Sequence, residues 1–457
     1  MKKTVRKSIA TIALSIVLSF ALVFSAFAGS FEHLADELFD LGLFKGTDSG
    51  FELDRAPNRG EALVMLIRLL GMEEEALAGE YAHPFTDVPN FFMPYVGFAY
   101  EKGLTTGVAE SSFGFRSLCT AQMYAAFVLR ALGYNEEAGD FTYSGALEFG
   151  KSKGIIDDFL ADGTFTRNEM VAVSHLALAA APKDGEFGSL LEKLVSGGAV
   201  TEAAAAPVLS RFALYEEFMA VGSELEDESG FELRFVMDID MGPLGAGTVT
   251  MDLSMAIDDQ DVAAAIIIDA AIAGEELAIQ IFVADGFVYI NDGSDKIKID
   301  AGLADIESII SMTDMNALAF NPSYLFKEIT KSTEGSYTVY TATLADSFME
   351  IAMGIAAGML DSAGLDTSDI LDLEGFSMHI PYMKYYADAD GALKRMTMSM
   401  SISMDMGILG ELAITVDADV EVVAVGDAVE VTLPDDLDEY VMLDPGAPQD
   451  PDAPDEA

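Results

Sequence analysis

The sequence contains no tryptophan, one cysteine and only four histidines among its 457 residues. Because Cys119 is the only cysteine, no disulfide can form within the chain, and apolar cores must stabilise its domains. The histidines show no zinc-ligand spacing, and the chain lacks a GxSxG motif, a P-loop and a helix-opening GxGxxG. We therefore expect no metal, no cofactor and no catalytic residue.

Positive charge is also scarce. The chain has 25 lysines and arginines against 77 aspartates and glutamates, which gives a net charge of −52. A surface of this charge repels nucleic acids and anionic membranes, so neither is an expected partner. It suits a salty or cation-rich exterior, where the charges are screened.

The first residues have the features of an export signal. Four basic residues precede an apolar run over about 9–24, and Ala26-Phe27-Ala28 follows as a small-residue cleavage site. This pattern predicts a secretory signal peptide over residues 1–28, with an uncleaved anchor as the alternative. No later run is long and apolar enough to cross a membrane, so we expect a secreted protein located at the cell surface.

One segment near the N-terminus occurs three times. Each copy has a glycine-led turn, a phenylalanine, a four-residue motif and an apolar run with helical spacing. The motifs are Asn-Arg-Gly-Glu at 58–61, Thr-Ala-Gln-Met at 120–123 and Thr-Arg-Asn-Glu at 166–169, and the phenylalanine lies eight positions before each motif's second residue. One copy is too small to bury its apolar face alone, so we expect the three to pack together.

The motifs also predict where helices begin. Asn58 and Thr166 are N-capping residue types, and Glu61 and Glu169 follow three positions later at the spacing of a capping box. We therefore interpret both glutamates as structural caps rather than as catalytic acids or bases.

Motif, spacing and triplication together resemble the S-layer homology domain, whose repeats carry Thr-Arg-Ala-Glu at the head of the second helix. The phrase Pro84–Pro89 (PFTDVP) resembles that family's opening segment. The resemblance covers residues 31–181, as repeats of about 31–73, 84–134 and 141–181. It implies an all-α trimer of repeats that attaches the protein non-covalently to a secondary cell wall polysaccharide. The family's early helix usually carries a tryptophan, for which Phe91, Phe92 or Tyr95 would have to substitute.

In that family the motif arginine helps to bind the polysaccharide, which implies this role for Arg59 and Arg167. A planar guanidinium recognises a carboxylate, such as that of a pyruvate ketal, through two parallel hydrogen bonds. The second copy has Ala121 in the arginine position, so at most two sites are expected to be competent. The alternative is that both arginines pair with nearby acids and hold the repeats together.

Four neighbours complete the expected polymer-binding set. Asn58 and Thr166 lie at helix N-termini, where backbone N–H groups can bind the same anion. Lys45 and Gly46 would add a cation and an amide near the first site, although Lys45 also suits a plain surface position.

From about Gly230 the apolar period changes from helical to two, which predicts antiparallel strands with one wet and one dry face. Asp285-Gly286 and Asp390-Gly391 are expected hairpin turns. Helices over about 304–312 and 347–360 would cover the dry face. The predicted strands are 231–241, 249–257, 262–272, 277–290, 382–386, 396–406, 412–422 and 429–433.

This arrangement resembles the half-barrel of bacterial lipoprotein carriers (LolA-like), over about 215–442. Methionines fall on the dry faces, where they would line a lipid-sized cavity or fill an ordinary core. The run Asp258–Asp261 lacks calcium-loop spacing and is interpreted as a solvated turn, with calcium binding as the alternative. The methionines are Met237, Met241, Met251, Met255, Met396, Met398, Met400, Met404 and Met406.

The predicted layout is an α + β multidomain protein: signal peptide 1–28, repeats 29–181, helical connector 182–214, β domain 215–442 and a disordered acidic, proline-rich tail 443–457. Three functions are compatible with it. The first is a wall-anchored surface protein, including an S-layer component. The second is a wall-anchored carrier of a lipid or other apolar ligand, and the third is an enzyme acting on wall polymers, for which no catalytic constellation is visible.

Overall fold

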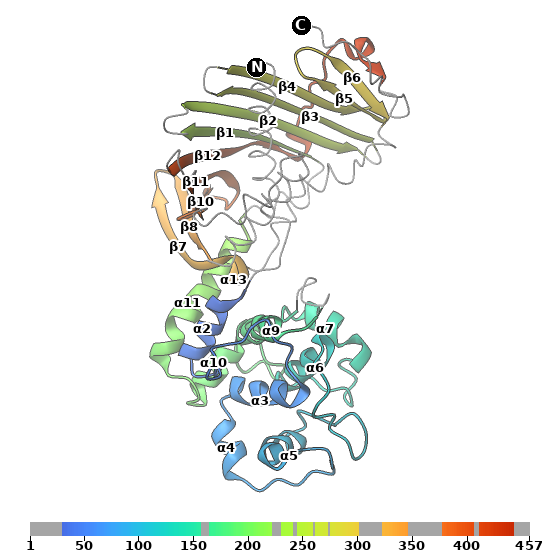
Figure 1. The fold of residues 1–457 in the computed structure, drawn as a ribbon, viewed down its shortest axis with the longest axis vertical. Coiled ribbons are helices and arrows are strands. Elements are labelled where there is room, and N and C mark those ends of the chain that lie inside the picture. The colour runs from blue at the N-terminus through green and yellow to red at the C-terminus, as the bar shows by residue number, and fades with distance from the viewer. Residues whose placement is uncertain are drawn as a thin grey trace.

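The computed structural model describes residues 30–156, 164–221, 230–240, 245–258, 261–272, 275–300, 322–345, 377–405 and 411–442. The chain forms a helical part and a large curved β-sheet, with one helix between them (Figure 1). Several predicted features lie outside the described residues: the signal peptide, Phe159, the helices over 304–312 and 347–360, Met241, Met406 and the tail 443–457. Of the run Asp258–Asp261, the two middle residues also lie outside them.

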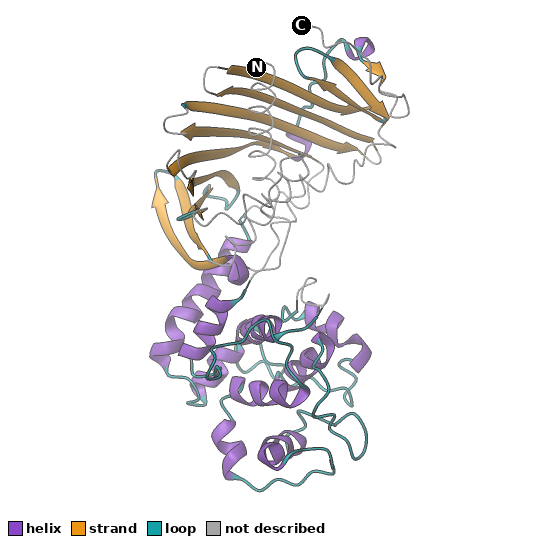
Figure 2. Cartoon of the chain, viewed as in Figure 1, coloured by secondary structure: helices purple, strands orange, loops and turns teal. Residues whose placement is uncertain are grey.

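Each of the three copies contains a first helix and a motif helix (Figure 2), and in the third copy residues 157–163 between them lie outside the described residues. The second helices, α3, α6 and α9, contact one another and contribute to one apolar core that also takes in the first helices. The bounds are α2 (Glu32–Asp40) and α3 (Arg59–Leu69) for the first copy, α5 (Met93–Glu101) and α6 (Ala121–Ala131) for the second, and α7 (Ala146–Ser152) and α9 (Arg167–Ala179) for the third. Helices α4 (Glu73–Ala78) and α10 (Leu190–Ser196) and the 3-10 turns η1 (Asn90–Phe92) and η2 (Tyr143–Gly145) lie between or after them.

The predicted caps start two of the three motif helices. The side chain of Asn58 accepts a hydrogen bond from Glu61 N (3.0 Å), and the Glu61 carboxylate accepts one from Asn58 N (2.9 Å). Thr166 and Glu169 form the corresponding box at α9, where the Thr166 N to Glu169 Oε2 distance is 2.6 Å. The structure therefore confirms the capping roles predicted for these four residues.

The β part is one open sheet. Its strands follow the order β13-β6-β5-β4-β3-β2-β1-β12-β11-β10-β8-β7, with β9 paired to β11. All described pairings are antiparallel except that of β13 with β6. The bounds are β1 (Gly230–Asp240), β2 (Ala246–Asp258), β3 (Asp261–Ile272), β4 (Glu275–Ala284), β5 (Phe287–Asn291), β6 (Lys296–Asp300), β7 (Phe326–Glu334), β8 (Tyr337–Leu344), β9 (Ser377–His379), β10 (Met383–Ala387), β11 (Leu393–Asp405), β12 (Glu411–Val425) and β13 (Val441–Met442).

The strand predictions hold where the apolar alternation is strong. Both turns join antiparallel strands, and Asp285 and Gly286 have φ of 51° and 75°, as a tight type I′ turn requires. Strands β6, β7, β8, β9 and β13 were not predicted. The predicted last strand, 429–433, is wrong. The chain leaves β12 through the turn η7 (Gly426–Ala428), and Val431 and Leu433 pack against a small apolar cluster that includes Phe282 and Tyr289.

Helix α11 (Glu202–Met219) belongs to both parts. Ala205 and Val208 are buried in the helical core, whereas Tyr215 is buried in the core of the sheet. The Tyr215 hydroxyl donates to the carbonyl oxygen of Phe326 at 2.9 Å. The predicted boundary between residues 214 and 215 therefore falls inside a continuous helix.

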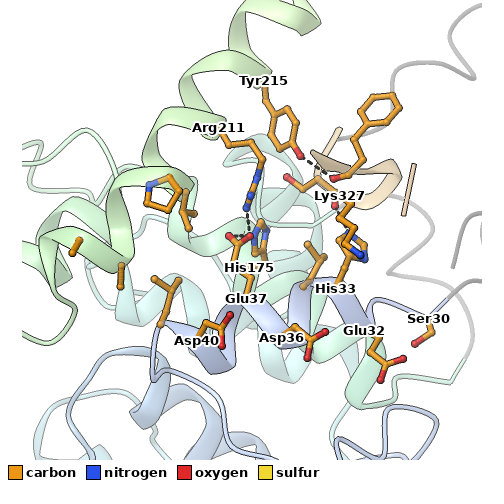
Figure 3. Close-up of a pocket in the computed structure, with 18 residues that line it drawn as sticks. Ser30, Glu32, His33, Asp36, Glu37, Asp40, His175, Arg211, Tyr215 and Lys327 are labelled. Atoms are coloured by element: carbon orange, nitrogen blue, oxygen red, sulfur yellow. Dashed lines mark hydrogen bonds and ion pairs between the residues drawn. The ribbon is translucent and has the colours of Figure 1, made fainter. Parts of the chain in front are cut away.

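A second contact joins the parts. The short helix α13 (Pro322–Leu325) brings Tyr324 into the helical core, where its ring lies 5.1 Å from that of Phe31. His33 Nε2 lies 2.8 Å from the carbonyl oxygen of Ser323 (Figure 3). The sheet is thus docked on α2 as well as held by α11.

Candidate functional site

The motif of the first copy docks on a loop of the second copy. Arg59 N donates to Ser117 O (2.8 Å), and Gly60 N donates to Phe115 O (3.3 Å). Cys119 N returns a bond to Pro57 O (2.9 Å). The head of α3 therefore forms a short backbone ladder with the segment that leads into α6.

The motif of the third copy docks on the first copy in the same register. Arg167 N donates to Arg55 O (3.0 Å), and Asn168 N donates to Leu53 O (2.9 Å). These acceptors lie four and six positions before Arg59, as Ser117 and Phe115 lie four and six before Ala121. The third copy therefore docks on the first and the first on the second, which explains why one copy alone is incomplete.

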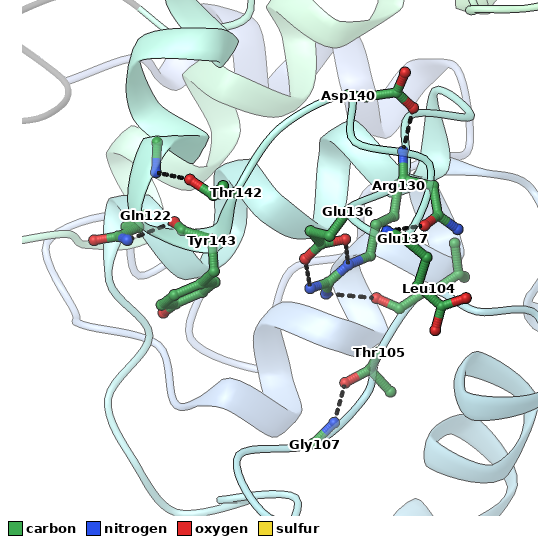
Figure 4. Close-up of polar contacts among 12 residues, drawn as sticks. Leu104, Thr105, Gly107, Gln122, Arg130, Glu136, Glu137, Asp140, Thr142 and Tyr143 are labelled. Carbon is green, nitrogen blue, oxygen red and sulfur yellow. Dashed lines mark hydrogen bonds and ion pairs between the residues drawn. The ribbon is translucent and has the colours of Figure 1, made fainter.

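Arg59 lies at the first of these interfaces, with only 4% of its surface exposed. Its guanidinium carbon is 5.1 Å from the ring centre of Phe113 and 4.7 Å from that of Phe127. Nη2 lies 3.4 Å from Thr105 Oγ1, which also accepts from Gly107 N (Figure 4). Nε is buried without a hydrogen-bond partner. We call this group the first arginine site.

Arg167 forms the second arginine site with the first copy. It is 7% exposed, its Nε donates to Phe51 O at 2.7 Å, and its guanidinium carbon is 5.2 Å from the ring centre of Phe44. Nη2 is buried without a partner. Phe44 and Phe51 occupy the positions in the first copy that Thr105 and Phe113 occupy in the second, so the two sites are built alike.

Neither arginine forms an ion pair with a carboxylate of the described residues. Burial lowers the pKa of both side chains, because a guanidinium is harder to charge when it is removed from water. Glu61, an acid whose charge acts on Arg167, is already bound by both Nη atoms of Arg55 at 3.0 Å. The described residues therefore do not support the alternative in which the arginines hold the repeats together through ion pairs.

Two details of the expected site differ in the structure. The first N–H groups of α3 and α9 bind the neighbouring loops, so they are not free for an anion, and the Asn58 and Thr166 side chains are occupied as caps. Lys45 and Gly46 directly follow Phe44, which contacts Arg167 of the second site. Lys45 is also paired with Glu73 at 2.5 Å.

The sequence did not identify Asp87 and Tyr143 as part of the first site. Asp87 accepts from the backbone N–H groups of Phe113, Gly114 and Phe115 at 2.7, 2.7 and 3.3 Å, which fixes the loop beside Arg59. Tyr143 is 45% exposed, and its carbonyl accepts from Gln122 Nε2 of α6 (2.6 Å; Figure 4). The segment PFTDVP contains Asp87, so this motif could have identified the residue from the sequence.

The aromatic residues considered as tryptophan substitutes divide by role. Phe92 packs on Phe115 with ring centres 4.6 Å apart, and Tyr95 is buried and donates to Glu73. Phe91 is 75% exposed. Phe92 therefore supports the loop of the first site, while Phe91 remains available at the surface.

Other chemistry has little basis in the described residues. Cys119 is buried, and burial raises the pKa of its thiol to about 12, so it is not a nucleophile at neutral pH. Within the described ranges no group of three or more His, Cys, Asp or Glu side chains is arranged to hold a metal ion. None of the described helices is long and apolar enough to cross a membrane.

Comparison with known proteins identifies a sequence relative. A cell surface protein of Thermoanaerobacter kivui is 25% identical over 340 residues, which is 69% of this chain and 41% of the relative. The chain thus spans about two fifths of that relative's length. No protein-family model matches the chain.

Two solved structures align with parts of the chain. LprF from Mycobacterium bovis aligns over 48% of this chain and 96% of its own, with 10% identity and a TM-score of 0.26. A LolA superfamily protein from Nitrosomonas europaea aligns over 49% and 95%, with 8% identity and a TM-score of 0.15. Both superpositions are partial.

Proposed function

We propose that this protein is a cell-surface protein whose helical repeats bind an anionic polysaccharide of the cell wall and thereby hold the β-sheet at the surface. The surface location is supported by the 25% identical relative, which is described as a cell surface protein. The predicted signal peptide is consistent with export. The proposal assigns the chain binding and display, with no catalytic step.

The observation that carries the proposal is the pair of matched, buried arginines without carboxylate partners. Leaving a buried N–H group unbonded costs about 1–3 kcal/mol, more for a charged group. Each of the two guanidinium groups leaves one nitrogen unbonded, although the chain has 77 acidic residues from which a partner was available. A ligand carboxylate would satisfy these donors with the two-pronged geometry that arginine favours.

The surroundings suit a sugar polymer that carries acid groups. Aromatic rings flank both planar guanidinium groups, since Phe113 and Phe127 contact Arg59 and Phe44 contacts Arg167. Exposed Phe91 of the second copy packs on Phe92 beside the first site, and exposed Tyr143 of the third copy lies in the turn that Gln122 contacts. Both rings offer an apolar face to a sugar ring. A pyruvate ketal is the acid group that the proposal favours.

The experiment is a binding isotherm of the full exported chain on isolated cell walls, before and after chemical removal of the secondary polysaccharide. We expect saturable binding only to walls that retain the polymer. Free pyruvate-bearing oligosaccharide should compete, whereas the same oligosaccharide without the ketal should not. Equal binding to stripped walls would refute the polysaccharide assignment.

A second candidate function concerns the sheet. Met237, Met255, Met383 and Met400 are at most 9% exposed and share one apolar cluster. Flexible methionines adapt to irregular apolar partners, which favours a lipid or similar ligand against this face. Saturable uptake of a fluorescent fatty acid by the full chain would support this function, and its absence would leave an ordinary core as the explanation.

A further inference from the structure

The loop that receives the first motif carries an exposed arginine. Arg116 lies between Phe115 and Ser117, whose carbonyl oxygens accept from Gly60 N and Arg59 N. The Arg116 side chain is exposed and has no hydrogen bond, ion pair or ring contact within the part of the chain that the structure describes. Such a cation stands out in a chain of 77 acidic and 25 basic residues. Cations of the repeats that do pair with a carboxylate are Lys45, Arg55, Arg68, Lys102 and Arg130.

The second arginine site carries an acid at the equivalent position. The third motif binds the carbonyl oxygens on either side of Asp54, just as the first motif binds those on either side of Arg116. The two loops also share a backbone conformation, because Gly114 and Glu52, each two positions earlier, have φ of 77° and 50°. Asp54 and Arg116 are both exposed, so the two sites differ in the sign of one charge at the rim.

The rest of the second loop is negative as well. Glu52 is exposed like Asp54, and Arg55, the one cation of residues 51–55, is paired with Glu52 at 3.6 Å and with Glu61 at 3.0 Å. An acidic group that approaches this loop is therefore repelled. At the first site the exposed rim charge is positive, whereas Arg59 itself is only 4% exposed.

We propose that Arg116 captures the acidic polymer at the first arginine site, and that the second site, with Asp54 at its rim, binds the polymer only after it is tethered. The inference rests on the polysaccharide binding proposed above and adds the residue that starts it. A charged residue at a rim acts mainly on the association rate, because it attracts an oppositely charged partner before contact. Tethering then raises the effective concentration of the polymer at the second site, which offsets the repulsion there.

The test is the association kinetics of the full chain on immobilised polysaccharide released from isolated cell walls. Arg116→Ala is compared with its parent in an Arg167→Met background, where only the first site remains. At about 50 mM salt we expect the association rate constant to fall about three- to fivefold and the dissociation rate constant to stay within about twofold. At about 500 mM salt the difference should largely vanish, because the Debye length is then only a few ångströms.

A charge reversal at the second site tests the same inference by a gain. In an Arg59→Met background, Asp54→Arg should raise the association rate constant about fivefold or more at low salt. Glu328→Arg, at an exposed position on β7, changes the net charge by the same amount and should raise it less than about twofold.

The buried anchor should behave differently from the rim. Arg59→Lys in the Arg167→Met background keeps the positive charge but loses the two-pronged geometry, so it should speed dissociation and leave association unchanged.

The outcomes separate this inference from the proposed function. An association rate that Arg116→Ala leaves unchanged at low salt, or that Glu328→Arg raises as much as Asp54→Arg does, would overturn the role of the rim charge. Binding that still depended on Arg59 and Arg167 would then leave the polysaccharide assignment in place. If the wild type does not bind the released polysaccharide, both proposals are wrong.

Discussion

At the scale of single residues, the two motif arginines raise a question of stability. Burial removes each guanidinium from water, which is unfavourable, and one buried nitrogen of each has no hydrogen-bond partner. The contacts with aromatic rings stabilise each cation by about 0.5–2 kcal/mol at most. A side chain kept under these conditions is better explained by a ligand than by folding. The consequence is that removing the charge should harm binding far more than it harms the fold.

We therefore expect Arg59→Met and Arg167→Met to leave the unfolding free energy unchanged or to raise it by up to about 2 kcal/mol, because methionine fills the space without an unpaired N–H. Each should weaken wall binding by tenfold or more, the equivalent of about 1.5–3 kcal/mol for a charged hydrogen bond. Urea unfolding and the wall isotherm measure the two effects.

Lysine in place of either arginine should rescue binding only in part, since it lacks the two-pronged geometry. Ala121→Ser is the matched control at the equivalent position of the second copy and should change neither quantity. A loss of more than 2 kcal/mol of stability in both Met variants would instead assign the arginines to the fold.

Gly60 shows a second effect at this scale. Its position in the motif holds glycine because the ring of Phe115 packs over it, and an added Cβ would lie 2.2 Å from that ring. Alanine in a helix usually gains about 0.5–1 kcal/mol over glycine, but overpacking costs about 1–3 kcal/mol. We expect Gly60→Ala to lower stability by about 1–2 kcal/mol in urea unfolding, and the added change Phe115→Val to restore it. A stabilised single variant would contradict this packing.

At the scale of elements, the loops matter as much as the helices. The sequence predicts the caps and helix starts because capping is local, within three or four residues. It does not reveal the partner of each motif, because Arg59 meets Thr105 across 46 positions and Arg167 meets Phe51 across 116. The strands β7 and β8 escaped prediction since β7 is mostly exposed and polar and so lacks a clear alternation.

The loop at 112–115 gives a prediction for an element. Asp87 binds three of its N–H groups and the hydroxyl of Ser112, so Asp87→Ala should loosen the wall of the first arginine site. In an Arg167→Met background, where only the first site remains, we expect about three- to tenfold weaker wall binding, the effect of losing about one net hydrogen bond. Ser112→Ala, which loses one bond to Asp87, should have a smaller effect.

The pH dependence of this loop has a defined sign. Slight burial would raise the pKa of Asp87, but the N–H groups of Phe113 and Gly114 lower it below its usual range. The stabilisation is therefore present above the ordinary carboxyl pKa and is lost as the pH falls through the lowered value.

If Asp87→Ala binds walls as tightly as its parent in the Arg167→Met background, the loop does not position the site.

At the scale of the whole molecule, the sequence predicted two parts and the change of period between them. It did not predict how they join. Strands β1 and β12 pair across the centre of the sheet although they lie at its two ends in the chain, and α11 was divided by the predicted boundary. The contact between His175 of α9 and Glu37 of α2 is equally remote in sequence, since the two residues are 138 positions apart. Contacts between residues so far apart in the sequence produce no periodic pattern from which they could be predicted.

The shared helix makes the two parts a cooperative unit, and this can be tested. Phe218, near the end of α11, packs edge-on against Phe326, Tyr340 and Tyr385, with ring centres 5.7, 5.8 and 4.8 Å apart. Because α11 is buried in both cores, the helical part and the sheet should unfold together. We expect one calorimetric transition for the wild type at pH 7.

Phe218→Ala should separate that transition into two, because removing a half-buried ring costs about 2–3 kcal/mol at the contact that couples the cores. The sheet should then unfold at the lower temperature while the repeats keep the original midpoint. Phe91→Ala, at a ring that is 75% exposed, is the matched control and should leave one transition. Two well-separated transitions in the wild type, or a single one in Phe218→Ala that is merely shifted, would show that α11 does not couple the cores. In the first case the sheet would be an independent passenger of the repeats, and in the second the coupling would lie in the contact between α13 and α2.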